Sequence, residues 1–187
     1  WSATGRLAIT LDPQWKNGDY YDGEPGEGPH AGLAVARSVA QITYRSDEVY
    51  QDRFGRNMVD PSQVFGHWDR FSVESYLDHH GEKLARRFDA NSYLILNRAM
   101  DLHDVARGRG SAERAFSMLQ ASALSISINT DTLYHPRLQS DLADLARGAG
   151  VETEYQIIDS PHGHDGFLLE ADAVGAALGK FLDRADG

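Results

Sequence analysis

The sequence contains no cysteine, no long apolar run and no excess of positive charge. The absence of cysteine excludes a disulfide framework, a zinc–thiolate site and a cysteine nucleophile, and it fits a reducing cytoplasm. No stretch approaches the roughly 18–20 apolar residues of a membrane-spanning helix, so no membrane partner is expected. Lysine and arginine together number 18 against 28 aspartate and glutamate residues, and the net charge is −10. A chain this acidic is unsuited to broad contact with nucleic acid or anionic lipid.

The 187 residues suit one domain or part of a larger one, with enough chain to bury a hydrophobic core. Hydrophobic residues make up 41% and charged residues 25%, which is a globular rather than a disordered balance. The chain opens with Trp1 rather than Met, and its start lacks the pattern of a signal peptide. We interpret this opening as an internal start, from a fragment, a processed chain or a trimmed polypeptide.

Helical patterns and loops dominate residues 1–110. Residues 12–32 are rich in Gly, Pro and Asp, which predicts a loop, and Pro61 and Gly66 indicate another loop over residues 59–69. Apolar residues recur at helical spacing through most of the remaining stretches. The predicted helices cover residues 33–45, 46–58, 71–87 and 89–100.

Residues 111–187 follow a different pattern, in which helices alternate with two β-type runs. The order α-β-α-β-α predicts an α/β fold with parallel strands and helical crossovers. Two strands are too few for a stable sheet. We therefore expect the far edge of a doubly wound sheet whose other strands are missing from this chain. The predicted helices are 112–119, 135–148 and 170–183, and the predicted strands are 122–129 and 153–159.

The loops after the two predicted strands carry the candidate chemistry, because ligands of open α/β sheets bind beyond the carboxyl ends of the strands. Asp131 follows the first strand and His164 follows the second, 33 residues later. Adjacent parallel strands would bring the two side chains together. An Asp after one strand and a His after the next is the chain order Ser…Asp…His of α/β hydrolases. In such a triad the Asp orients the His, and the His takes the proton of a serine nucleophile.

Each candidate also has a purely structural interpretation. Asp131 alone is typical of an Asx turn or a helix cap, and a single His in a Gly-rich loop is usually solvated. A metal site at His162 and His164 lacks a third ligand nearby. The same objection applies to the sets Asp101, His103, Asp104 and His79, His80, so we expect no metal.

Several motifs together resemble the homoserine O-acetyltransferase family, and the resemblance runs in order along essentially the whole chain. The family is an α/β-hydrolase fold with a helical lid, and the resemblance identifies this chain as its C-terminal portion. Residues 1–110 would then be the lid region with an N-terminal loop, and 111–187 the C-terminal part of the core. The motifs are Asp12–Tyr21 (DPQWKNGDYY), Gly32–Arg37 (GLAVAR), Ile42–Ser46 (ITYRS), Arg53–Arg56 (RFGR), Val73–Leu77 (VESYL), Arg87–Tyr93 (RFDANSY), Arg98–Asp101 (RAMD) and Gly163–Asp165 (GHD).

The resemblance implies transfer of an acetyl group from acetyl-CoA to the hydroxyl of homoserine, in methionine biosynthesis, through an acyl-serine intermediate. It implies no permanently bound cofactor and a homodimer built largely by the lid. By motif, Asp131 is the triad acid and His164 the triad base. Arg37 would hold the substrate carboxylate, which a guanidinium fork suits, and Asp165 would hold the substrate ammonium. Without the resemblance, Arg37 reads as a surface helix cation and Asp165 as a charge at a helix start.

The main departure from the family is the missing nucleophile, because no G-x-S-x-G elbow occurs in the chain. Ser75 and Ser92 lie inside helical patterns, so neither is a credible substitute. The resemblance therefore requires an N-terminal portion of the same enzyme as a partner that carries the serine. A smaller departure is His135, in a loop where the family more often has Leu-Phe-Pro-Pro. Other acceptors such as serine or a natural-product alcohol (deacetylcephalosporin C acetyltransferase is similar too), a succinyl donor, simple ester hydrolysis and an inactive lid or dimerisation fragment stay open.

Overall fold

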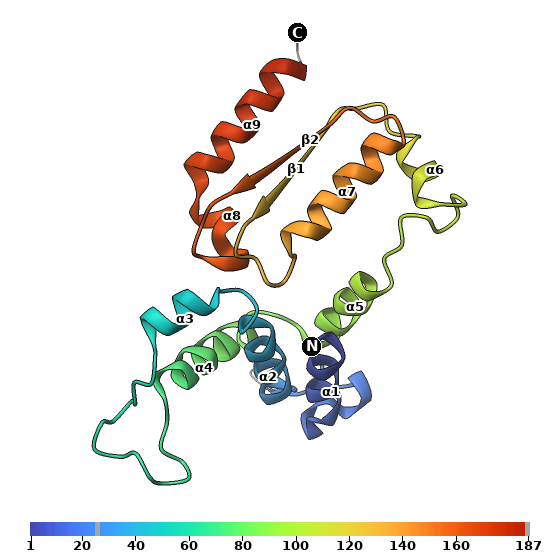
Figure 1. Cartoon of the computed structure of the whole chain (residues 1–187). Helices are drawn as coiled ribbons and strands as arrows, with labels where there is room; N and C mark the ends of the chain where they lie inside the picture. Colours follow the sequence, from blue (N-terminus) through green and yellow to red (C-terminus); the bar gives the residue numbers. More distant parts are fainter. Residues whose placement is uncertain (25–26, 186–187) are drawn as a thin grey trace. The chain divides into compact units, whose positions relative to one another are not determined.

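The computed structural model describes residues 1–24 and 27–185, and its contacts divide the chain into two compact units (Figure 1). The first unit contains Trp1–Ile42 and Tyr50–His103, and the second contains Thr43–Val49 and the chain from Asp104 onward. A short segment between two helices of the first unit thus belongs to the second. The division at residue 110 proposed above stays a prediction about domains, because these units are defined by contacts alone.

The first unit is helical, as its periodicity predicts. Its apolar core contains Ile9, Leu33, Ala36, Ala85 and Ala90, with Trp15, Tyr20 and Tyr93 among the side chains packed around it. Across the described residues, none of the helices combines the length and the apolar character that crossing a bilayer requires. The elements are α1 (Ser2–Leu11), the 3-10 helix η1 (Pro13–Gly18), α2 (His30–Gln41), α4 (Ser72–Ala85) and α5 (Ala90–Asp101), with α3 (Asp47–Arg53) spanning the boundary between the units.

The expected loop over residues 12–32 is only partly present. It contains η1, and α2 begins already at His30. Asp12 explains both features, because its Oδ1 accepts a hydrogen bond from the Gln14 amide at 3.0 Å and its Oδ2 accepts one from the Gly32 amide at 2.8 Å. One carboxylate therefore satisfies free amides in the first turns of two helices.

Gly32 sets the close approach of α1 to α2. A Cβ atom on Gly32 would lie 2.5 Å from the Ala8 carbonyl oxygen and 2.8 Å from the Ile9 Cα. Only a residue without a side chain fits between these backbones. The glycine in the GLAVAR motif therefore has a packing reason that is independent of any chemistry.

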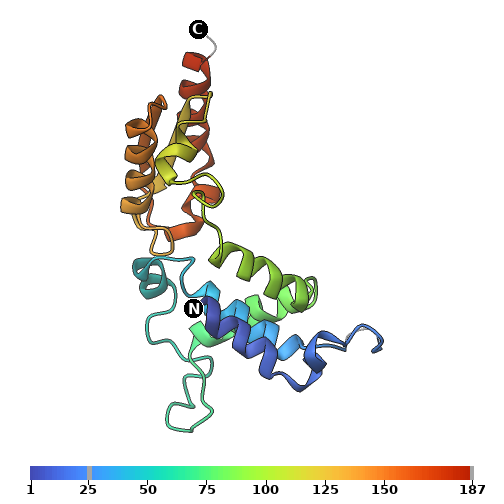
Figure 2. The same cartoon turned by 90° about the vertical axis from the view of Figure 1, so that its right-hand side faces the viewer.

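The second unit confirms the predicted strand–helix–strand arrangement. Strands β1 (Ala123–Ile128) and β2 (Thr153–Ile158) pair in parallel, from Ala123 opposite Thr153 to Ile128 opposite Ile158. The crossover helix α7 and the last long helix α9 lie on opposite sides of the two strands (Figures 1 and 2). This is the α/β arrangement of parallel strands and helices that the sequence predicts. The remaining elements of the unit are α6 (Ala112–Phe116), α7 (Pro136–Gly148), η2 (Gly163–Asp165), α8 (Gly166–Leu169) and α9 (Ala171–Ala185).

Candidate active site

The two loops predicted to carry chemistry begin at the same edge of the sheet. Ile128 and Ile158 are paired at the ends of their strands, and the Asn129 amide donates to the Ile158 carbonyl at 3.1 Å. The side chain of Asn129 extends the link, because its Oδ1 accepts from the Ser160 amide at 2.9 Å. The loops therefore leave the sheet in a fixed mutual position.

Asp131 and His164 are in direct contact. The His164 Nδ1 lies 2.9 Å from Oδ2 of Asp131. The other carboxylate oxygen, Oδ1, accepts hydrogen bonds from the amides of Leu133 at 2.8 Å and Tyr134 at 2.9 Å. Asp131 is only 7% exposed. One carboxylate oxygen therefore closes an Asx-type turn, as the structural interpretation predicts, while the other contacts the imidazole. A catalytic role for Asp131 stays a prediction.

His164 is held by three aromatic rings. The ring centroids of Tyr44, Tyr134 and Phe167 lie 5.5, 5.4 and 5.5 Å from that of the imidazole. The hydrogen bond to Asp131 favours the tautomer with the proton on Nδ1, which leaves Nε2 as the proton acceptor. A buried carboxylate against Nδ1 also stabilises the imidazolium that forms when Nε2 takes a proton. This geometry suits a general base and its orienting acid, and the catalytic roles of the two residues stay predictions.

The loop that carries His164 is fixed by backbone contacts on both sides. Thr130 donates its hydroxyl proton to the Ser160 carbonyl at 2.6 Å and accepts from the Gly163 amide at 3.0 Å. Gly163 has a φ of +67°, and a Cβ there would lie 2.6 Å from the Ser46 amide nitrogen. The residue before the candidate base therefore has to be glycine for both conformational and steric reasons.

Residues 44–46 form a supporting segment that sequence reasoning missed. The Tyr44 carbonyl accepts from the Asp165 amide at 3.1 Å, Arg45 forms an ion pair with Asp165 at 3.2 Å, and the Ser46 hydroxyl donates to the Pro161 carbonyl. The ITYRS motif was visible in the sequence, but its spacing gave no sign that it lies beside a loop more than 100 residues away. Its position in the second unit follows only from the folded structure.

The remaining predicted residues take the following places. Arg37 is partly buried on α2 in the first unit, and its role stays a prediction. Ser75 and Ser92 lie in α4 and α5, neither of which is a nucleophile elbow. His135 is exposed directly before α7. No group of three or more His, Asp or Glu side chains in the described part of the chain is placed to hold a metal ion.

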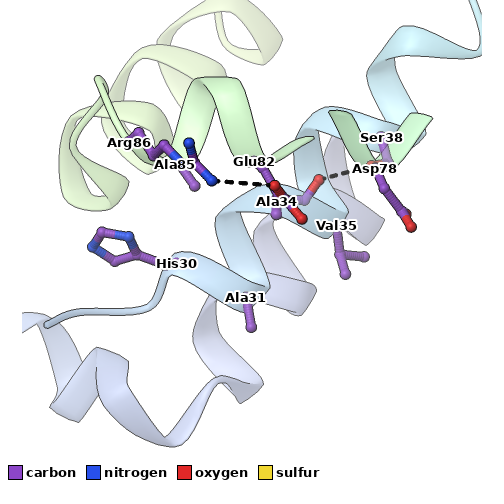
Figure 3. A pocket seen from close by; sticks show the side chains of 9 residues that line it. All are labelled: His30, Ala31, Ala34, Val35, Ser38, Asp78, Glu82, Ala85 and Arg86. Carbon is purple, nitrogen blue, oxygen red and sulfur yellow. Dashed lines mark hydrogen bonds and ion pairs between the residues drawn. The ribbon is translucent and has the colours of Figure 1, made fainter. Parts of the chain in front are cut away.

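A separate cavity lies between α2 and α4 in the first unit, and its lining carries charges of both signs (Figure 3). The Arg86–Glu82 ion pair at 3.4 Å crosses part of it, between side chains that are 78% and 64% exposed. An ion pair this exposed contributes little. The lining residues are His30, Ala31, Ala34, Val35, Ser38, Asp78, Glu82, Ala85 and Arg86, and none of them was a sequence candidate.

Comparison with known proteins extends the resemblance read from the motifs. The homoserine O-acetyltransferase of Carboxydothermus hydrogenoformans is 44% identical over 188 residues, covering 100% of this chain and 49% of that protein. The Thermobifida fusca homoserine O-acetyltransferase is 46% identical over 182 residues, covering 97% of this chain and 47% of that protein. The chain spans about half the length of the curated relatives it matches. No family model matches the chain.

Solved structures show the same similarity as the sequence comparison. Homoserine O-acetyltransferase from Bacillus anthracis has a TM-score of 0.79 at 27% identity, covering 90% of this chain and 44% of that one. Esterase E22 has a TM-score of 0.83 at 23% identity, covering 97% of this chain and 49% of that one, and shows a shared fold only. The resemblance is thereby confirmed: along its whole length, this chain is similar to homoserine O-acetyltransferases, of which it spans about half the length.

Proposed function

We propose that this chain provides the acid and the base of the catalytic triad of an acyl-CoA-dependent homoserine O-acetyltransferase. The observation that carries the proposal is the contact between buried Asp131 and His164 Nδ1, at the carboxyl ends of two parallel strands. The serine nucleophile would come from an N-terminal portion of the same enzyme, since a base and an orienting acid alone cannot transfer an acyl group.

In the first half-reaction, the serine hydroxyl attacks the thioester carbonyl of acetyl-CoA. His164 Nε2 accepts the hydroxyl proton, while Asp131 stabilises the imidazolium. When the tetrahedral intermediate collapses, the carbon–sulfur bond breaks and CoA leaves as the thiol with the proton that His164 returns. An acetyl-serine ester remains.

In the second half-reaction, the side-chain hydroxyl of homoserine attacks the acetyl-serine carbonyl. His164 takes the proton of that hydroxyl and then gives it to the departing serine oxygen, so that O-acetylhomoserine and free enzyme result. Arg37 and Asp165 would select an α-amino acid by binding its carboxylate and its ammonium group.

The proposal includes the setting expected from the sequence. It places the enzyme in the cytoplasm, in methionine biosynthesis, as a homodimer formed through the helical lid. Acetyl-CoA acts as a co-substrate, and no cofactor is permanently bound. The acidic net charge does not oppose this, because the acceptor is a zwitterion.

The test uses the complete enzyme that contains this chain, with acetyl-CoA and homoserine as substrates. Release of CoA thiol and the mass of the product are followed for wild type, His164→Ala and Asp131→Asn. We expect each substitution to lower kcat by about 10⁴–10⁶-fold, as removal of the acid or the base of a triad does elsewhere. A His164→Ala enzyme with unchanged turnover would overturn the assignment of the base.

His135→Ala is the matched control, because His135 lies in the loop after the same strand as Asp131 but is exposed. Its turnover should stay near that of wild type. Omitting homoserine separates transfer from hydrolysis: one equivalent of CoA followed by arrest indicates a transferase, and continuous release indicates an esterase-like enzyme. Serine and succinyl-CoA, offered in competition, test the alternative acceptor and donor.

A further inference from the structure

The ion pair between Arg45 and Asp165 lies directly beside the candidate base. Their closest atoms, Arg45 Nη2 and Asp165 Oδ2, are 3.2 Å apart, and the two side chains are 21% and 20% exposed. Asp165 follows His164 in the chain, and its amide is bound to the Tyr44 carbonyl at 3.1 Å. Asp165 is therefore held at its backbone and at its side chain by two consecutive residues of one segment.

This pair differs from the ion pairs on the helix surfaces of the same unit. Arg137–Asp141, for example, joins side chains that are 84% and 61% exposed, and such pairs contribute little. The Arg45 guanidinium is mostly removed from solvent, and its Nε is buried without a hydrogen-bond acceptor among the described residues. A charge this desolvated needs its partner, so removal of either side chain leaves the other uncompensated.

A carboxylate has two oxygens and about four lone-pair directions. A guanidinium on Oδ2 restricts the rotation of the group but leaves capacity for a second cation. An ammonium group of a bound amino acid is a cation of this kind, and a carboxylate fixed in advance loses less conformational entropy when it binds one.

We propose that Arg45 is a positioning residue that selects amino-acid acceptors by fixing the direction of the Asp165 carboxylate. The inference rests on the proposed function, in which Asp165 receives the ammonium group of homoserine. Arg45 itself touches neither the acceptor nor the reacting atoms in this account. Its effect should therefore appear only for acceptors that carry the ammonium group.

The experiment compares two acceptors in the complete enzyme: homoserine, and 4-hydroxybutanoate, which has the same hydroxyl and carboxylate but no amino group. In Arg45→Gln, we expect kcat/KM for homoserine to fall by about 10–100-fold, the loss that goes with one charged hydrogen bond. The value for 4-hydroxybutanoate and the initial burst of CoA release should change less than threefold. Arg45→Lys, which keeps the charge without the planar fork, should give a smaller loss in the same direction.

Two further variants test whether Arg45 acts through Asp165. If Arg45 acts through Asp165, the double variant Arg45→Gln/Asp165→Asn should be no worse toward homoserine than Asp165→Asn alone. Arg184→Gln is the matched control, because it breaks an arginine–carboxylate pair with Glu154 in the same unit, away from the triad. In that control, kcat/KM for homoserine and kcat/KM for 4-hydroxybutanoate should both stay near their wild-type values.

The experiment distinguishes failure of the proposed function from failure of the inference about Arg45. A wild-type enzyme that does not acetylate homoserine overturns the proposed function and the inference with it. An active wild type whose Arg45→Gln variant loses both acceptors equally, or loses neither, overturns the inference alone. If Arg45→Gln does not fold, Arg45→Lys carries the decision, because an equal loss for both acceptors in that variant contradicts the proposal.

Discussion

Asp89 shows how one carboxylate can organise a loop and a helix end at once. Its Oδ2 accepts from the Ser92 amide at 2.7 Å and caps α5, while its Oδ1 accepts from the Tyr20 hydroxyl. Burial by itself raises the pKa of Asp89, but the hydrogen bonds from Tyr20 and Ser92 outweigh it and hold the pKa below its usual value. Burial, together with the bond to Asp89, raises the pKa of Tyr20 well above its usual value.

Asp89→Ala is expected to lower the free energy of unfolding by about 1–2 kcal/mol at neutral pH, because a helix cap and a partly buried hydrogen bond are lost together. A carboxylate whose pKa is lower in the folded state stabilises the protein above its unfolded-state pKa of about 4. That contribution disappears as the pH falls through the folded-state pKa. The difference between wild type and variant should therefore shrink in acid.

Urea unfolding at pH 7 and at pH 3 measures this difference. Asp52→Ala, at an exposed position on α3, serves as the control and should unfold at the same urea concentration as wild type at both pH values. A gap between wild type and Asp89→Ala that widens in acid would refute the account.

Gly163→Ala should damage the active site without removing any functional group. Its φ of +67° disfavours alanine, and the added Cβ would lie 2.6 Å from the Ser46 amide nitrogen. We expect kcat to fall by at least about tenfold, since a small displacement of a catalytic side chain is costly. Gly148→Ala, with nothing within 4 Å of the added Cβ, should leave kcat unchanged, and equal kinetics in the two variants would contradict the steric argument.

Among the elements, the strand–helix–strand unit was the most predictable from sequence. The first strand is a β-type run rich in Ile and Ser, the second has an alternating pattern, and α7 ends at a glycine, so local signals agree with the fold. Helix α1 was not predicted, and the structure gives the reason. The side chain of Trp1 makes no capping hydrogen bond and the first turn has no acidic residue, so the usual start signals are absent. Its buried residues, Gly5 and Ile9, pack against other helices, and tertiary packing rather than local preference stabilises it.

The candidate site, like the fold, could be predicted from the sequence only in part. Asp131 and His164 could be predicted to meet, because parallel strands bring the ends of consecutive loops together. The support from Tyr44, Arg45 and Ser46 could not, because nothing in a single sequence reports a contact across 115 residues such as that of Ser46 with Pro161. The catalytic and binding roles themselves stay predictions until the kinetics above are measured.

The contact between α1 and α2 offers a test at the level of elements. Gly32→Ala adds about 0.5–1 kcal/mol of helix propensity, but its Cβ would meet the α1 backbone at 2.5–2.8 Å. The clash should dominate, and we expect a net loss of about 1–3 kcal/mol in the free energy of unfolding. Thermal unfolding of the complete enzyme measures it, and a raised Tm would show that α1 and α2 can separate at no cost.

At the scale of the whole molecule, many large apolar side chains are exposed and the sheet of the second unit has only two strands. A two-stranded sheet is marginal in water, and exposed apolar surface of this extent favours association. Half-exposed aliphatic residues occur on α7, β2 and α9, among them Leu138, Leu142, Ile157, Leu178 and Leu182.

We therefore expect the 187-residue polypeptide, produced alone, to bind a hydrophobic dye such as ANS and to unfold over a broad range of urea concentration. Coexpression with the N-terminal portion that the proposed function requires should reduce dye binding and sharpen the transition. ANS fluorescence measures the dye binding, and circular dichroism during a urea titration follows the unfolding transition. A sharp, two-state transition of the isolated polypeptide without dye binding would contradict this expectation.

Residues 43–49 belong to the second unit although the chain on both sides of them belongs to the first. The backbone therefore crosses between the units at residues 42–43, 49–50 and 103–104. Within residues 1–187, a chimera that exchanges the first unit between two related proteins needs three junctions, not one. A single cut near residue 110 would place a foreign 43–49 segment against the native loop that carries His164. Under the proposed function, this would change the position of the base and the choice of acceptor in one step. Transplants that leave residues 43–49 with the recipient avoid that mismatch.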